Sequence, residues 1–398
     1  MKKTVLKKYA DLLVRRGVSL KKGQCLTVFA SVDQAPLVKE IVAAGYKQGA
    51  KAVSVEWSFD EIEKLHYKHQ SLKTLSEVPN WKIEKLKNRV ETLPARIYIT
   101  SEDPDGMKGV NQAKIAKARM ATYPILKPFI DQIENKEQWC IAGAASPAWA
   151  KKVFPGLKKK EAVEKLWDAI MQTSRMCDDP VAAWDEHNKN LKEKCDYLNN
   201  LHLKELHYTS SNGTNLTVGL AKESTFGFPK DRKRPEGFVP FTPNIPSEEI
   251  CTSPHKFRTE GIVYATKPLV LGGKKIENFG FRFENGKVVE VLAEEGREML
   301  ESLVRTDEGA CYLGECALVE YHSPISMSGY VYYTTLIDEN ASCHLALGRA
   351  LNSGSGIEYF NESQIHIDFM IGAADTEIVG ITEDGRKVQI FHNGDFAI

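Results

Sequence analysis

The sequence predicts two domains of different fold class: an α/β domain with a parallel sheet, followed by an α+β catalytic domain that is mostly antiparallel. At 398 residues the chain is longer than a single hydrophobic core usually serves. Before residue 190, short β-rich runs alternate with helical patterns, which is typical of a parallel sheet with crossover helices. After residue 203, strand-like runs are separated by Gly and Asn turns. We therefore expect domains at 1–190 and 191–398.

The first half opens with an amphipathic helix, because the apolar residues of the first 14 positions recur at helical spacing. Strands are expected at 25–30, 52–57, 96–100 and 139–143, and helices at 35–48, 110–120 and 149–153. No Gly-x-Gly-x-x-Gly or Walker-type loop follows any of these strands, so we expect a scaffold and not a nucleotide site. A charged helix from 179 to 201, with His187 as a solvated residue, should connect the two halves.

The second half carries a strong hairpin signal, because Asn285-Gly286 lies between the strand-like runs 280–283 and 287–291. Further strands are expected at 206–209 and 216–220. One helix is expected over 294–305, and another is expected to run through His344 to Leu351, with a possible start near Asn340.

Composition gives no support to a nucleic-acid-binding or membrane-spanning function. Lys plus Arg and Asp plus Glu number 53 each, so net charge offers no argument for a nucleic acid or an anionic membrane as partner. No stretch approaches the roughly 20 apolar residues that cross a bilayer. The eight cysteines include no Cys-x-x-Cys pair, which favours buried free thiols in a reducing compartment.

The most informative motif is His366-x-Asp368. In a strand these two side chains share one face, while the apolar residues between and beside them share the other. Burying an imidazole beside a carboxylate is costly unless both are paired, and a divalent cation would satisfy both. A buried salt bridge is the alternative.

Further candidates lie in three other patches of the second half. Glu315 is the one charge inside an apolar run, so it must be neutral, ion-paired or bound to metal. His344 is either a core histidine or a ligand. Glu248 and Glu249 form either part of a site or a solvated turn, and Asp338 and Glu339 could simply cap a helix. Taken together, five or six oxygen and nitrogen ligands exceed what one tetrahedral zinc needs and suit two divalent ions, with Glu315 as the bridge.

These patches resemble the thermophilic metalloaminopeptidase family, the family of aminopeptidases T and S. The resemblance rests on NIPSEEICTSPH (244–255), LGECALVEYHSPIS (313–326), TLIDENASCHLALG (335–348) and IHIDFMIG (365–372), and extends more weakly over nearly the whole chain. It implies a cytoplasmic, homodimeric exopeptidase that acts on peptides with a free amino terminus. It also implies a dinuclear site for Zn, Co, Mn or Mg that activates water.

Carried over residue by residue, the resemblance implies six metal ligands: Glu249, Glu315, Glu339, His344, His366 and Asp368. Glu248, beside a ligand and otherwise unassigned, is the candidate general base that takes the water proton.

One residue departs from the family pattern. The family carries a tyrosine seven residues past the histidine of the third patch, where this chain has Leu351. Either Tyr333, Tyr359 or another donor replaces it, or turnover falls, since the loss of one transition-state donor costs about 10²- to 10³-fold in rate. The alternatives are therefore a metal- or peptide-binding member with weak or altered activity, and a hydrolase of non-peptide amides.

Overall fold

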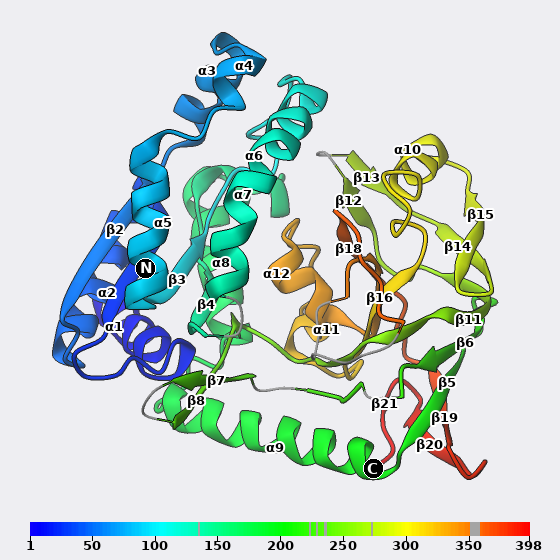
Figure 1. Ribbon diagram of the computed structural model, residues 1–398. Coiled ribbons are helices and arrows are strands. Elements are labelled where there is room, and N and C mark those ends of the chain that lie inside the picture. Colours follow the sequence, from blue (N-terminus) through cyan, green and yellow to red (C-terminus); the bar gives the residue numbers. More distant parts are fainter. Residues whose placement is uncertain (134–135, 223, 228–229, 235–236, 272–273, 351–358) are drawn as a thin grey trace. The chain divides into compact units, whose positions relative to one another are not determined.

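The computed structural model describes residues 1–398 except 134–135, 223, 228–229, 235–236, 272–273 and 351–358 (Figure 1). The chain separates into two compact units. The first comprises Met1–Asp185 and Pro229–Pro246, and the second comprises Glu186–Phe228 and Ser247–Ile398. The segment 229–246 thus belongs to the first unit although it follows residue 190 in sequence. A division into domains at residue 190 stays a prediction.

A five-stranded parallel sheet in the order β2-β1-β3-β4-β9 forms the centre of the first unit. Its strands are β1 (Cys25–Ser31), β2 (Ala52–Ser58), β3 (Ala95–Thr100), β4 (Trp139–Gly143) and β9 (Asn244–Ile245). The first four confirm the expected strands. Alternate side chains of β1, namely Leu26, Val28 and Ala30, are buried, as the period of a strand requires.

Helices connect the parallel strands of this unit, because strands that run the same way need a crossover. They are α2 (Ala35–Lys47), α3 (Asp60–His69), α4 (Leu72–Leu75), α5 (Asn80–Thr92), α6 (Gln112–Ile133), α7 (Pro147–Val153) and α8 (Lys159–Thr173), whereas α1 (Lys3–Leu12) precedes the first strand. α6 is longer than the expected 110–120, since it continues through Pro124 and Pro128. α3, α4 and α5 were not expected, and they bury no residue that would mark an apolar stripe.

The first unit also contains the hairpin β7 (Lys230–Arg234) and β8 (Gly237–Phe241). The helix α9 (Pro180–Asn200) confirms the expected connecting helix and contributes residues to both units. Among the described residues, no helix is long and apolar enough to span a membrane.

Two antiparallel sheets dominate the second unit. The larger has the order β15-β14-β11-β6-β5-β19-β20-β21 and the smaller the order β10-β16-β17-β18. The larger consists of β5 (Leu203–Thr209), β6 (Asn215–Leu220), β11 (Pro254–Tyr264), β14 (Phe279–Glu284), β15 (Lys287–Ala293), β19 (Glu377–Thr382), β20 (Lys387–His392) and β21 (Asp395–Phe396). The smaller consists of β10 (Ile250–Thr252), β16 (Leu313–Leu318), β17 (His344–Gly348) and β18 (His366–Met370). The β14–β15 hairpin confirms the Asn285-Gly286 signal.

Short elements complete the unit. They are the strand pair β12 (Leu269–Leu271) and β13 (Lys274–Ile276), the helices α10 (Arg297–Leu303), α11 (Pro324–Ser328) and α12 (Thr335–Asp338), and a 3₁₀ turn at Glu339–Ala341. α10 is shorter than the expected 294–305.

One hydrophobic core joins the two sheets of the second unit. β14 contributes Phe279, Phe281 and Phe283, and β18 contributes Phe369 from the smaller sheet. The rings of Phe281 and Phe369 lie 5.2 Å apart in an edge arrangement, which is a favourable geometry for aromatic pairs. This core buries one face of the smaller sheet and leaves its opposite face for polar side chains.

The helix expected over 344–351 is wrong, because His344–Gly348 forms the strand β17. β17 pairs with β16 on one side and with β18 on the other, and all five of its residues are buried. A strand buried on both faces shows no alternation of polar and apolar residues, so its sequence resembles that of a buried helix. Pairing with β16 and β18 therefore makes residues 344–348 a strand, which local periodicity does not predict.

The helix expected to begin near Asn340 is also wrong. Asp338 is the last residue of α12, and Glu339 begins the 3₁₀ turn. Asp338 instead accepts hydrogen bonds from the backbone N–H groups of Tyr332 (2.7 Å) and Thr334 (3.0 Å), so it orders the chain that precedes α12.

We predict that Phe281→Ala lowers the free energy of unfolding of the second unit by about 3–5 kcal/mol, because it leaves a cavity between the two sheets. Phe281 is 1% exposed. Urea unfolding followed by circular dichroism measures the change. The matched control is Phe257→Ala on β11, whose side chain is 45% exposed and which should cost roughly 1 kcal/mol or less. Equal losses in the two variants would contradict this account of the core.

Candidate metal centre

The polar face of the four-stranded sheet carries most of the candidate ligands. Along β18, Ile367 and Phe369 enter the core, so His366 and Asp368 lie on the opposite face. Along β17, Leu345 and Leu347 enter the core, so His344 lies on that same opposite face. The alternation that puts apolar side chains into the core therefore gathers the imidazoles and carboxylates on one side.

A β-bulge directs Glu315 to this face. The register between β16 and β17 shifts between Leu313 and Glu315, and bulges commonly re-aim a side chain beside a functional site. Leu313 and Cys316 belong to the core. With the extra residue between them, Glu315 turns away from the core while Leu313 stays in it.

Small side chains leave room between the ligands. Ala346 lies opposite Glu315 on one side and opposite Asp368 on the other, so its methyl group separates the two carboxylates across the sheet. Ala317 lies opposite His344 in the same way. Sequence reasoning missed these alanines, although each follows a candidate ligand by two residues and so lies on its face.

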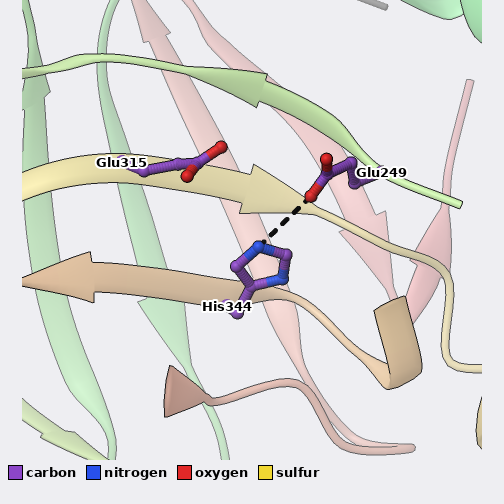
Figure 2. Close-up of side chains that lie close together, drawn as sticks. All are labelled: Glu249, Glu315 and His344. Carbon is purple, nitrogen blue, oxygen red and sulfur yellow. Dashed lines mark ion pairs between the residues drawn. The ribbon is translucent and has the colours of Figure 1, made fainter. Parts of the chain in front are cut away.

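Five of the predicted ligands form two overlapping groups. Glu249, Glu315 and His344 make one, Glu315, His366 and Asp368 make the other, and in each group one ligand atom per residue lies within 4.8 Å of the others. His344 Nε2 lies 3.3 Å from Glu249 Oε2 (Figure 2). His366 Nε2 lies 3.0 Å from Glu315 Oε2 and 3.3 Å from Asp368 Oδ1. Glu315 is common to both groups.

Backbone carbonyls orient both imidazoles. His344 Nδ1 lies 3.2 Å from the carbonyl oxygen of Ser342, and His366 Nδ1 lies 2.7 Å from that of Arg349. A carbonyl oxygen only accepts, so each Nδ1–H donates and each Nε2 faces the carboxylates. Metal-binding histidines are held in this way in many proteins.

The electrostatic balance of the cluster keeps both histidines protonated when no cation is bound. Burial lowers the pKa of His344, but Glu249 outweighs burial and raises that pKa to about 9. Burial also lowers the pKa of His366, while Asp368 and Glu315 raise it to about 10. Burial opposes ionisation of Asp368, yet the two histidines lower its pKa below the usual value.

The donor set fits divalent cations. Metal-to-ligand distances of about 2.0–2.2 Å place two donors on one ion at most about 4.4 Å apart, close to the spacing within each group. Carboxylate oxygen with imidazole nitrogen suits Zn, Co and Mn, and carboxylate oxygen suits Mg. A carboxylate with two oxygens, shared as Glu315 is, can contact two ions.

Glu339, the predicted sixth ligand, lies beside the two groups without belonging to either. Burial raises its pKa well above the usual value, and the charges of Glu249, Asp368 and Glu315 raise it further. Its Oε1 accepts a hydrogen bond from Asn340 Nδ2 at 3.4 Å. The same amide side chain anchors the next candidate, since Asn340 Oδ1 accepts from the backbone N–H of Glu248 at 2.7 Å.

Glu248 is buried and has His187 as a neighbour. His187 Nε2 lies 3.7 Å from Glu248 Oε2 and 2.8 Å from the carbonyl oxygen of Ser247. The expectation that His187 is a solvated helix residue is therefore wrong, because its side chain is only 13% exposed and turns toward residues 247–248. A lone histidine in a charged helix gives no signal for a contact sixty residues away in sequence.

The residues around the missing tyrosine are only partly described. Leu351 lies outside the described residues. Tyr359 stacks on His255 with ring centroids 4.7 Å apart and is 47% exposed, and Tyr333 adopts a left-handed backbone conformation with φ of 57°. Replacement of the family tyrosine by either residue stays a prediction.

Comparisons with known proteins identify the family of this chain. The family model described as thermophilic metalloprotease (M29) matches residues 2–396. Aminopeptidase AmpS of Bacillus subtilis is 42% identical over 98% of both chains. The structure of wild-type AmpT from Thermus thermophilus is 36% identical, covers all of both chains and superposes with a TM-score of 0.91. A 2,5-dihydroxypyridine dioxygenase from Pseudomonas putida, 11% identical with a TM-score of 0.52, covers 99% of this chain and 96% of its own and shares the fold alone. The chain therefore belongs to the thermophilic metalloprotease (M29) family.

Proposed function

We propose that this chain removes single residues from the free amino terminus of peptides, with two divalent ions held by Glu249, Glu315, His344, His366 and Asp368. The family is a metalloprotease family, and relatives 37–42% identical over nearly the full chain are named aminopeptidases. On that similarity the enzyme is a metal-dependent hydrolase and an exopeptidase. The dinuclear site and its ligands are our proposal.

One observation carries the proposal: Glu315 is shared by two groups that each hold an imidazole and a further carboxylate. A single ion would explain one group and leave the other as an unexplained buried ion pair. Two ions with Glu315 as the bridge would use every donor, and Glu339 would be a sixth ligand beside them. A buried polar network is stable when all of its members are satisfied.

The chain's own residues would then have distinct tasks. Bound ions supply an acidified water and a Lewis acid for the scissile carbonyl. The carbonyl oxygens of Ser342 and Arg349 hold the imidazoles so that each Nε2 stays directed at the site. Ala346 keeps the space above the sheet open, and we assign Glu248 as the general base that takes the water proton and passes it to the leaving amine.

Weak or altered turnover is the second candidate function, and the presence of Leu351 in place of the family tyrosine motivates it. A rate about 10²- to 10³-fold below that of a tyrosine-containing relative, with metal fully bound, would favour it. Side-by-side assays on leucine p-nitroanilide decide between fast and weak turnover.

The homodimer and the cytoplasmic location stay predictions. Sedimentation of the purified protein tests whether it is a homodimer.

We predict that Glu315→Gln loses both metal ions and activity falls by more than about 10²-fold, because the shared carboxylate is removed. Glu249→Gln and Asp368→Asn should each retain one ion, since each belongs to one group only. Elemental analysis of the dialysed proteins gives the stoichiometry. Glu320→Gln is the control, because Glu320 pairs with Lys194 and lies outside both groups. Two ions per chain in the Glu315 variant would refute the site.

We predict that Glu248→Gln lowers kcat by about 10²- to 10⁴-fold while the metal content stays that of the wild type, since a general base contributes on this scale. Steady-state kinetics together with elemental analysis separate the two effects. Loss of metal in this variant would make Glu248 a ligand, and unchanged kcat would remove it from the mechanism.

We predict that metal binding releases about two protons per chain at pH 7. His344 and His366, with pKa values of about 9 and about 10, are protonated in the metal-free protein and must lose the Nε2 proton to bind an ion. The apparent affinity for each ion should therefore rise by up to about 10-fold per pH unit, and level off near pH 9 for the group with His344 and near pH 10 for the group with His366.

Titration calorimetry in buffers with different ionisation enthalpies counts these protons. The matched control is His322→Ala, whose exposed histidine pairs with Asp395 outside the cluster and which should release the same number. A binding enthalpy that is the same in every buffer at pH 7 would contradict the proposed ligation by the two histidines.

A further inference from the structure

A small cavity of about 230 Å³ opens beside the proposed metal centre, within the second unit. Lys267, Asp338 and Met370 line it, together with the chain at Gly329, Tyr330 and Val331. Met370 follows Asp368 by two residues on β18, so it lies on the ligand-bearing face about 6.5 Å further along the strand. Asp338 directly precedes Glu339. The cavity is therefore a neighbour of the cluster on the same face of the sheet.

Hydrogen bonds fix the segment that carries Lys267. The backbone N–H of Thr266 donates to the carbonyl oxygen of Met370 at 2.8 Å, and its hydroxyl donates to that of Gly372 at 2.7 Å. These bonds attach residues 266–268 to the end of β18. The backbone next to Lys267 is thus held at the cavity wall.

Lys267 brings a positive charge into this wall, and the described part of the chain gives it no direct partner. Its side chain is half-buried, and among the described residues no carboxylate lies within 4 Å of its Nζ and none accepts a hydrogen bond from it. Asp338, the acid that acts on it through its charge, is already engaged by the N–H groups of Tyr332 and Thr334. An ammonium group has three donors, and leaving them unsatisfied in a partly buried site is costly.

We propose that Lys267 binds the main-chain carboxylate at the C-terminus of dipeptide and tripeptide substrates, so that the enzyme favours short peptides with a free carboxyl end. This inference rests on the proposed function, which places the amino end of the peptide at the metal centre. An extended peptide advances about 3.5 Å per residue, so two or three residues span the distance from Asp368 to the cavity. The volume lies below the roughly 300–1,000 Å³ of sites that enclose larger ligands, which suits the end of a short chain.

Kinetics on matched peptides test the inference. In the wild type, KM for Leu-Gly should be about 10- to 100-fold lower than for Leu-Gly amide, the range expected of one hydrogen bond to a charged group. Lys267→Met should raise KM for Leu-Gly to that of the amide while kcat stays within about threefold. Lys267→Arg should retain most of the preference, because the charge remains.

Lys275→Met serves as the matched control, since Lys275 pairs with Glu277 at 2.9 Å and does not line the cavity. It should leave both KM values unchanged. Equal KM values for Leu-Gly and Leu-Gly amide in the wild type would overturn the inference. An equal rise in KM for both substrates in Lys267→Met would overturn it as well. A Lys267-dependent preference seen only with Leu-Glu amide would also overturn it, because the ligand would then be an acidic side chain.

Binding without turnover separates this inference from the proposed function. The probe is a Leu-Gly analogue whose peptide bond is replaced by a methylene-amine link, titrated calorimetrically into the metal-loaded protein. Tighter binding than its C-terminal amide, abolished in Lys267→Met, supports the carboxylate site even in a protein that hydrolyses no peptide. Hydrolysis of peptides with no such difference in binding would leave the proposed function intact and refute the role of Lys267.

Discussion

Compensation of charge on one buried sheet face is the constraint on which the second unit depends. Three carboxylates and two imidazoles lie close together where water is largely excluded, and like charges there would repel strongly. Without a cation, protons on His344 and His366 compensate two of the three negative charges, as their raised pKa values indicate. In our proposal two cations replace these protons, so metal binding and proton release are one exchange at the same atoms.

The backbone makes this arrangement possible because the same alternation serves two purposes. Every second residue of β17 and β18 packs into the core with the aromatic rings of β14, and the residues between them include His344, His366 and Asp368 of the cluster. The bulge before Glu315 places the shared carboxylate on the same face as the two histidines. The small methyl groups of Ala317 and Ala346 leave the space above that face open. A shift of one residue in register would exchange the core and the site.

The proposals for the metal centre and for Lys267 fit one physical picture of an exopeptidase. A protein that acts only at chain ends needs to recognise an end, and the two ends of a short peptide carry opposite charges. The carboxylate cluster includes Asp368, and Met370, two residues further along the same face of β18, lines the cavity together with the half-buried Lys267.

The sequence by itself determined the residue types available to the proposed site, and it predicted a parallel sheet followed by antiparallel sheets. The alternation at 366–368 predicts that His366 and Asp368 share one face of a strand, because side chains in a strand alternate with a period of two. The single charge in the run around Glu315 predicts a paired or ligated carboxylate, because burying an unpaired charge is costly. Only the tertiary structure decided that His344 lies in a strand, that His187 contacts residues 247–248, and that Glu315 is shared. These outcomes depend on pairing partners far away in sequence: β17 is buried on both faces between β16 and β18, and local periodicity carries no information about which strands will flank it.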